Sequence, residues 1–230
     1  FGLERKLDGW QRPKPVFKNL RQLTRERDQV VEERTMVKNQ LHAEQTEAEP
    51  NKKSVQRIRE RIKMLNKQEN EIKAEISALI KQDSDLAGHI DIISSLTGVG
   101  ELTASIVLAE TNGFELIRNK RQLASYAGFD IKEKQSGTSI KGKPRISKKG
   151  NKHLRKAMHL PSLNAIRFDE RFKAIFTRLV SRHGIKMKAA VAVQRKMLEM
   201  MFTLYKTRNK YDKNYLNNNA AKAEQQIQIT

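Results

Sequence analysis

The sequence predicts an all-α protein in which a long antiparallel coiled-coil hairpin precedes a second, more compact helical domain. Two observations support this fold class. Apolar residues recur at helical spacing along most of the 230 residues, and no stretch of convincing length alternates apolar with polar residues as a strand does. A chain of this length has room for one large domain or two small ones.

Composition and periodicity divide the chain into four segments. Residues 1–15 form an irregular lead-in, because two prolines within it disfavour the start of a helix. Residues 16–84 carry the coiled-coil pattern, and residues 85–208 form the helical domain. Residues 209–230 are rich in Asn, Lys, Ala and Gln, which predicts a disordered polar tail. Since the chain begins with Phe1 rather than Met, we expect it to be a fragment of a longer protein.

Seam residues at alternating spacings of four and three predict two helices that pair as a coiled coil. The first seam comprises Val16, Leu20, Leu23, Arg27, Val30, Arg34, Val37 and Leu41, and the second Val55, Ile58, Ile62, Leu65, Glu69, Ile72, Ile76 and Leu79. The interruption at Glu49-Pro50-Asn51 predicts the turn between the helices. In such a hairpin Arg27 lies level with Glu69, and this buried pair would set the register of the two helices.

So long a seam with few large apolar residues is a weak core for a monomer. We therefore expect the hairpin to make the protein a homo-oligomer or to dock a partner. The alternative is a passive spacer.

The charge balance points to a polyanionic partner. The chain has 46 Lys and Arg against 26 Asp and Glu, a net charge of +20 and a sequence pI near 10.2. DNA, RNA and an anionic membrane surface all match this excess. No run of eighteen apolar residues is present, so we expect no membrane-spanning helix, and no signal-peptide pattern opens the chain.

Composition also excludes several kinds of site. The chain has no Cys, which removes disulfides, zinc fingers and thiol nucleophiles. Its five His are scattered and none forms an HxxxH pair, so we predict no metal held by this chain.

A glycine turn between two predicted helices is the first candidate for a phosphate site. Gly98, Val99 and Gly100 precede a helix with small residues on one face, including Thr103. Such a turn directs backbone N–H groups outward, and the following helix adds its N-terminal partial charge. This pattern resembles the helix-hairpin-helix motif that binds DNA. The alternative is a turn that only lets two helices pack closely.

A basic segment follows. Residues 131–160 contain ten Lys and Arg and one acid, so they hold nearly half of the net positive charge. We expect its cations to bind DNA phosphates; they include Lys141, Lys143, Arg145, Lys148, Lys149, Lys152 and Arg155.

Ser136, followed by Gly137, lies within this basic segment and has two interpretations. Either the segment is a flexible loop that coats nucleic acid, or Ser136 is a nucleophile toward a phosphodiester whose developing charge the cations stabilise. No His lies beside it as a base, and Ser139 and Ser147 are rival hydroxyls.

The order of these motifs resembles a known family over about residues 1–212. The matching runs are FGL at 1–3, WQRP at 10–13, LTGVGELTA at 96–104, LASYAGF at 123–129, QSGTSI at 135–140 and RISKKGNKHLRKA at 145–157. They strongly resemble the IS-one-ten family of bacterial insertion-sequence transposases, the DEDD-type group that also contains Piv-like DNA invertases.

The resemblance implies that Ser136 is the recombinase nucleophile and that residues 85–208 form a transposase domain. It also implies an N-terminal RuvC-like domain whose acids hold Mg²⁺. Because those acids are absent from this chain, we expect the chain alone to bind DNA without recombining it. Members that use a guide RNA, called a bridge RNA, make RNA a further expected partner. The expected location is the bacterial cytoplasm, at the nucleoid. The alternative function is a non-catalytic scaffold that binds nucleic acid.

Overall fold

The computed structural model confirms the all-α prediction. It describes residues 14–115, 117–132, 135–136, 140–141 and 145–215. Within these ranges the chain forms eight α-helices and four strands of only two residues each. It folds as two compact units, Phe1–Gln82 and Asp83–Thr230. None of the described helices is both long and apolar enough to cross a membrane.

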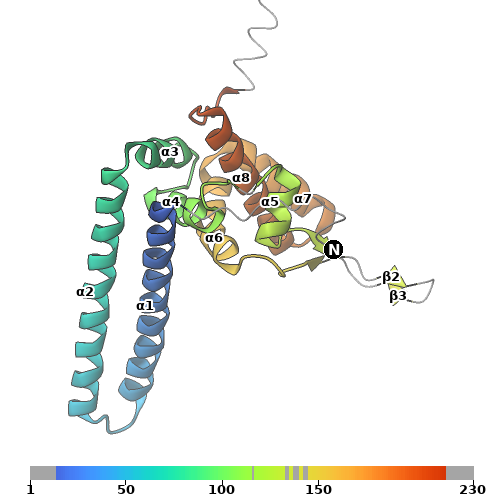
Figure 1. Cartoon of the computed structure of the whole chain (residues 1–230). Helices are drawn as coiled ribbons and strands as arrows, with labels where there is room; N and C mark the ends of the chain where they lie inside the picture. The colour runs from blue at the N-terminus through green and yellow to red at the C-terminus, as the bar shows by residue number, and fades with distance from the viewer. Residues whose placement is uncertain (1–13, 116, 133–134, 137–139, 142–144, 216–230) are drawn as a thin grey trace, which may run out of the picture. The chain divides into compact units, whose positions relative to one another are not determined.

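The first unit is a hairpin of two long helices that lie side by side (Figure 1). Helix α1 is Pro15–Thr46 and begins with Pro at its first position, where the missing N–H is not needed. Helix α2 is Lys52–Gln82. Asn51 caps α2, because its Oδ1 accepts hydrogen bonds from the backbone N–H groups of Lys53 (3.0 Å) and Ser54 (3.1 Å).

The predicted seam is confirmed over most of the hairpin and shifts at one end. Val37, Ile58 and Leu65 form a buried cluster, against which further seam residues pack. At the start of α1, Phe17 is buried in place of the predicted Val16, which is half-buried. Phe17 has the larger apolar side chain, so its burial contributes more to stability. Two further positions also differ from the prediction. Thr24 and Ile80 are buried, whereas the predicted Leu23 and Leu79 are only partly buried.

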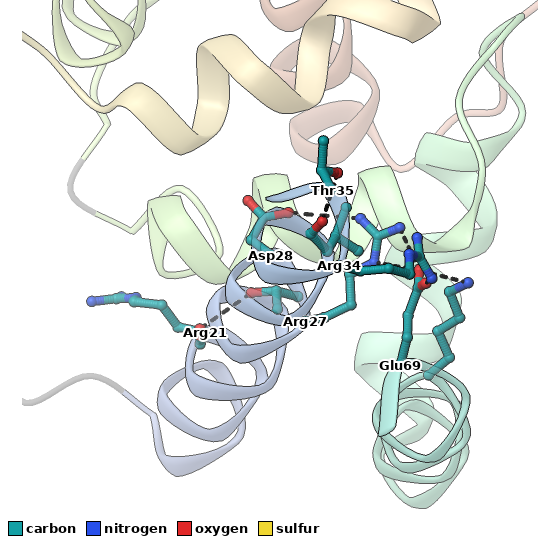
Figure 2. A network of polar contacts seen from close by, with 9 residues as sticks. Arg21, Arg27, Asp28, Arg34, Thr35 and Glu69 are labelled. Carbon is teal, nitrogen blue, oxygen red and sulfur yellow. Dashed lines mark hydrogen bonds and ion pairs between the residues drawn. The ribbon is translucent and has the colours of Figure 1, made fainter. Parts of the chain in front are cut away.

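The predicted pairing of Arg27 with Glu69 is also confirmed (Figure 2). Arg27 on α1 donates from Nη2 to Glu69 Oε1 on α2 at 2.7 Å, and Arg34 donates to the other carboxylate oxygen. Lys73 Nζ lies 2.9 Å from Glu69 Oε1. Burial raises the pKa of Glu69, but hydrogen bonds from these three cations outweigh it and lower the pKa from 4.5 to about 2. Two residues 42 positions apart are thus held level.

The second unit contains six helices. They are α3 (Ser84–Ser94), α4 (Glu101–Thr111), α5 (Lys120–Ala127), α6 (Lys152–Phe168), α7 (Glu170–His183) and α8 (Lys186–Thr207). Helix α8 packs against α3, α5, α6 and α7, while α4 packs against α3 and α6 (Figure 1). Every residue of α4 from Ala104 to Thr111 is buried. The ring of Phe114, itself fully buried, packs edge-on against Phe202 of α8 at a centroid distance of 5.4 Å.

Polar side chains determine where several of these helices begin. Asn151 caps α6 as its sequence position predicts, since its Oδ1 accepts from the N–H groups of His153 (2.9 Å) and Leu154 (3.3 Å). Asn119 caps α5 and Asp83 caps α3 in the same manner. The connections between helices are therefore defined by local chemistry.

Two details of these helices are not apparent from the sequence. Helix α6 continues through Pro161, a residue type that usually interrupts a helix, and the proline is buried. In α7, Phe172 is buried, while the other large apolar residues, Ile175, Phe176, Leu179 and Val180, are half-buried. Helix α7 contacts only α6 and α8, so one side of it faces solvent.

The basic segment also contains short strands that its polar composition did not predict. Strand β1 (Ile131–Lys132) pairs antiparallel with β4 (Arg145–Ile146), and β2 (Gln135–Ser136) pairs antiparallel with β3 (Ile140–Lys141). The second pair lies between the two strands of the first pair in the sequence, and we call residues 131–146 the basic ribbon. Ladders of two residues are too short to produce a period-two pattern in the sequence.

Candidate nucleic-acid interface

The glycine turn packs against α6 through Gly98. Gly98 has φ +87°, and a Cβ placed on it would lie 2.6 Å from the carbonyl oxygen of Pro161. Glycine is therefore needed here both for the backbone conformation and for the close approach of α6. Gly100 has φ −104° and open space around it, so the demand for glycine lies at Gly98 rather than Gly100. Val99 is buried, and Thr103 is half-buried.

Asp169 links this turn to the end of the described chain. It is 4% exposed, and its Oδ2 accepts hydrogen bonds from Thr97 Oγ1 and the Tyr211 hydroxyl, both at 3.0 Å. Tyr211 also donates its backbone N–H to Ser95 Oγ at 2.8 Å. Burial, the charge of Asp169 and the hydrogen bond from the Tyr211 hydroxyl to Asp169 raise the pKa of Tyr211 to about 12. Sequence reasoning missed this link, because no local pattern connects residues so far apart.

The two ends of the basic ribbon cross at a point where only glycine fits. A Cβ on Gly150 would clash with the carbonyl oxygen of Tyr126 and the backbone nitrogen of Gly128. These are backbone atoms, which cannot rotate away as a side chain does. The segments 126–130 and 147–151 therefore pass in direct backbone contact, and we call them the ribbon base.

Hydrogen bonds join the two strands of the ribbon base. Ser147 donates from its N–H to the Asp130 carbonyl (2.8 Å) and from Oγ to Asp130 Oδ1 (2.6 Å). Asn151 donates its N–H to the carbonyl of Tyr126 at 2.7 Å. Ser147, one of the rival hydroxyls, is thus engaged in holding the ribbon base, and the helix cap that it was expected to offer comes from Asn151.

Arg155 and Glu110 connect the ribbon base to the helical core. Arg155 Nη1 donates to the carbonyls of Ala127 (2.8 Å) and Gly150 (2.9 Å), which lie on opposite sides of the crossing. Glu110, 2% exposed on α4, accepts a hydrogen bond from Asn151 Nδ2 at 2.6 Å. Arg155 was predicted as a phosphate ligand; its guanidinium is directed at backbone carbonyls of the ribbon base.

Four of the cations predicted to bind phosphate lie near the ribbon base and are exposed. They are Arg145, Lys148, Lys149 and Lys152. None of the four forms an ion pair with a carboxylate of the described residues, so their charge remains available to a polyanion. The backbone of Lys141 lies in β3, and Lys143 falls outside the described residues.

Ser136 lies in β2, where its backbone is paired with that of Ile140 in β3. The register places it at the last described ladder position, next to the undescribed residues 137–139, which include Ser139. The ribbon therefore carries Ser136 on a two-stranded element whose base is fixed to α4, α5 and α6.

The described residues offer no metal site. They contain no group of three or more His, Asp or Glu side chains suited to hold an ion. The chain's own described residues therefore do not fit the Mg²⁺ that the resemblance implies.

Comparison with known proteins supports the motif-based interpretation. Residues 90–177 match the model of a family described as Transposase IS116/IS110/IS902. The chain is 26% identical over 141 residues to the pilin gene-inverting proteins of Moraxella bovis and Moraxella lacunata, which covers 60% of this chain and 44% of each relative.

A third relative is the insertion element IS110 uncharacterized 43.6 kDa protein of Streptomyces coelicolor. It is 26% identical over 148 residues, which covers 64% of this chain and 35% of that protein. The chain thus matches less than half the length of these three relatives.

Proposed function

We propose that this chain is part of a transposase of the family described as IS116/IS110/IS902, whose model matches residues 90–177, and that it exchanges the DNA strands of an insertion sequence with Ser136 as nucleophile. The observation that carries this proposal is the family match over residues 90–177, which includes the whole basic ribbon and its base. The names of the relatives agree with it, since an insertion-element protein and a gene-inverting protein both point to DNA rearrangement.

The proposed step is a transesterification. The Ser136 hydroxyl oxygen attacks a DNA phosphorus, a bond from phosphorus to a deoxyribose oxygen breaks, and the hydroxyl proton passes to that leaving oxygen. The resulting phosphoserine conserves the energy of the phosphodiester, so the reverse reaction with another strand end rejoins DNA without ATP. The Lys and Arg side chains of the basic ribbon and its base would stabilise the pentavalent phosphate.

The fixed ribbon base supports this role for Ser136. A nucleophile must meet the phosphorus in a narrow range of geometry, and small displacements cost large factors in rate. The Gly128–Gly150 crossing and the two carbonyl contacts of Arg155 limit how the ribbon leaves the helical core. We assign Arg155 and Asn151 as positioning residues, which act on the ribbon rather than on the substrate.

Several partners belong to the same proposal. DNA phosphates would bind the exposed cations near the ribbon base, and the N–H groups at Gly98 and Gly100 would bind a further phosphate. Val99 instead donates its N–H to the Leu96 carbonyl at 3.0 Å. A guide RNA would be a second nucleic acid, and the α1–α2 hairpin would join protomers. The enzyme would act at the bacterial nucleoid. Mg²⁺ would need acidic ligands other than the described residues.

A covalent-trapping experiment tests the nucleophile. When the chain is tested together with the RuvC-like domain that the resemblance implies, we expect Ser136→Ala to assemble on DNA, because one hydroxyl adds little to an interface of many phosphates. It should lose strand exchange and the protein–DNA adduct. Ser147→Ala is the matched control, which removes a hydroxyl bonded to Asp130 and should keep the adduct.

Two outcomes would contradict the proposal in different ways. An adduct that persists in Ser136→Ala and maps to Ser139 or Ser147 would move the nucleophile within the ribbon. DNA binding without any adduct or exchange in the unsubstituted protein would instead favour a non-catalytic scaffold.

Sedimentation of this chain tests the assembly role of the hairpin. We expect a dimer or larger species whose fraction rises with protein concentration. A monomer throughout the micromolar range would leave the hairpin as a spacer.

A further inference from the structure

The turn between α7 and α8 is a second exposed basic surface, separate in sequence from the basic ribbon. All eight residues from Ser181 to Lys188 are exposed, and we call this segment the α7–α8 tip. Helices α7 and α8 pack against each other, so the tip is the end of a helical hairpin that is held together by contacts between its two helices.

The cations of the tip are not neutralised by the protein. Arg182, Lys186 and Lys188 lie in the tip and Arg178 lies one turn before it in α7. Within the part of the chain that the structure describes, none of these four forms an ion pair, and the tip contains no acid. Further along α8 the pattern is different, because Glu199 binds Arg195 at 2.8 Å and Lys196 at 3.0 Å.

Two large apolar side chains lie among these cations. Ile185 is 56% exposed and Met187 is 61% exposed. They do not belong to the core, since the buried face of α8 begins at Ala189. Exposed apolar residues enclosed by positive charge indicate a partner that presents both anionic groups and apolar surface at close range.

We propose that the α7–α8 tip binds the minor groove of duplex DNA, with Ile185 and Met187 inserted against base steps and the flanking cations on the phosphates. Proteins that bend DNA commonly insert Ile or Met in this way, and base steps are the apolar surface next to two rows of phosphates. The DNA partner rests on the proposed function, but this second contact does not depend on Ser136.

The size and charge of the tip favour DNA over other partners. A stable protein–protein interface needs about 800 Å² from each side, which eight residues with two apolar side chains do not supply. A membrane-bound helix presents a strongly exposed apolar face along its whole length. In the described α7–α8 hairpin, the large apolar side chains that are more than half exposed are Ile185 and Met187, which lie within one turn, while the large apolar residues of α7 are half-buried or buried.

Two variants of this chain separate the two kinds of contact. For Lys186→Gln with Lys188→Gln, we expect the slope of log K against log salt to become less steep by about 1.8 units, since each phosphate contact contributes about 0.9. For Ile185→Ala with Met187→Ala, we expect roughly tenfold weaker binding to duplex DNA at an unchanged slope, as for the loss of apolar burial. The apolar variant should also lose the fluorescence increase of 2-aminopurine that reports unstacked base steps.

Lys63→Gln with Met64→Ala is the matched control. Both residues are exposed on α2 of the hairpin, and Met64 is 53% exposed, so this variant removes one exposed charge and one exposed apolar side chain away from the tip. We expect this control to keep the 2-aminopurine fluorescence increase and most of the affinity for duplex DNA.

The outcomes distinguish the inference from the proposed function. If the unsubstituted chain binds no DNA, DNA as partner fails for both. If the unsubstituted chain binds DNA, and the tip variants bind DNA and unstack bases as well as it does, only the assignment of the tip as a DNA contact is wrong. Binding of the chain to anionic vesicles that is lost in the apolar variant, with DNA binding intact, would overturn the proposal in favour of a membrane surface.

Discussion

The α1–α2 hairpin and the α7–α8 tip use positive charge in opposite ways. In the hairpin, Arg27, Arg34 and Lys73 converge on the buried carboxylate of Glu69. In the tip, Lys186 and Lys188 have no carboxylate partner within the described residues. The hairpin cations bind Glu69 and set the register of two helices, whereas the tip cations remain available to a ligand. Net charge alone therefore does not locate a binding surface; the distribution of acids does.

The basic ribbon resembles the tip rather than the hairpin. Arg145, Lys148 and Lys149 are exposed near the ribbon base, and only Arg155 is used internally. The ribbon base is held by backbone contacts at Gly150, by Ser147 with Asp130, by Asn151 with Glu110 and by Arg155. None of these contacts uses the side chain of Arg145, Lys148 or Lys149.

The largest expected effect is on salt-dependent DNA binding. Glutamine would replace five cations of the ribbon and its base: Lys141, Lys143, Arg145, Lys148 and Lys149. The slope of log K against log salt should become less steep by about four units, since each lost phosphate contact removes about 0.9. Fluorescence anisotropy at several salt concentrations measures this slope.

The control removes five exposed cations of α2: Lys52, Lys53, Arg57, Arg59 and Arg61. It lowers the net charge equally. An equal change in slope for both variants would show that net charge, rather than the ribbon, determines binding.

Glu69→Gln should destabilise the hairpin by about 3–5 kcal/mol, because it leaves two arginines and a lysine together without their counter-charge. The pKa of Glu69 is lowered from 4.5 to about 2, so its stabilising effect is present above pH 4.5 and is lost as the pH falls toward 2. Between pH 4.5 and pH 2, the free energy of unfolding of the unsubstituted protein should fall by about 3 kcal/mol more than that of Glu69→Gln.

Urea unfolding followed by circular dichroism at several pH values checks this prediction. Glu71→Gln is the control on the same helix, because its ion pair with Lys67 is exposed. If Glu71→Gln and Glu69→Gln behave alike, the buried network does not set the stability of the hairpin.

Gly150→Ala should destabilise the second unit by about 1–3 kcal/mol, because the added methyl group meets backbone atoms of Tyr126 and Gly128. Displacement of the ribbon should also lower strand exchange more than DNA affinity. Gly88→Ala is the control: it has open space inside α3 and should stabilise by about 0.5–1 kcal/mol. Thermal unfolding measures both, and an unchanged melting temperature for Gly150→Ala would contradict the tight crossing.

Tyr211→Phe should have the smallest effect: it should destabilise the second unit by about 1 kcal/mol, because the hydrogen bond to Asp169 is lost. The pKa of Tyr211 is raised from 10 to about 12, so its contribution is complete below pH 10 and is lost as the pH rises toward 12. Ultraviolet absorbance titration should show a late ionisation that becomes smaller by one tyrosine in the variant, while Tyr205, whose pKa is also raised by burial, is unaffected. Tyr215→Phe, at an exposed position, should leave that late step unchanged.

Local features of the molecule could be predicted from the sequence. The two long helices, the pairing of Arg27 with Glu69, the caps at Asn151 and Asn119 and the helices on either side of the glycine turn all follow from spacing or from neighbouring residues. Helical periodicity, capping and coiled-coil register act over a few residues or along one repeating seam, so they leave a readable pattern. The motif order likewise predicts the resemblance to the transposase family whose model matches residues 90–177.

Contacts between distant segments were decided only by the tertiary structure. It directs Arg155 to the carbonyls of the ribbon base, assigns the positive φ to Gly98, engages Ser147 with Asp130 and joins Tyr211 to Asp169. The same cationic side chain can bind a phosphate or a carbonyl, and the sequence alone does not distinguish the two. The choice depends on which backbone groups the packed helices bring within hydrogen-bonding distance, because an unpaired buried carbonyl is costly.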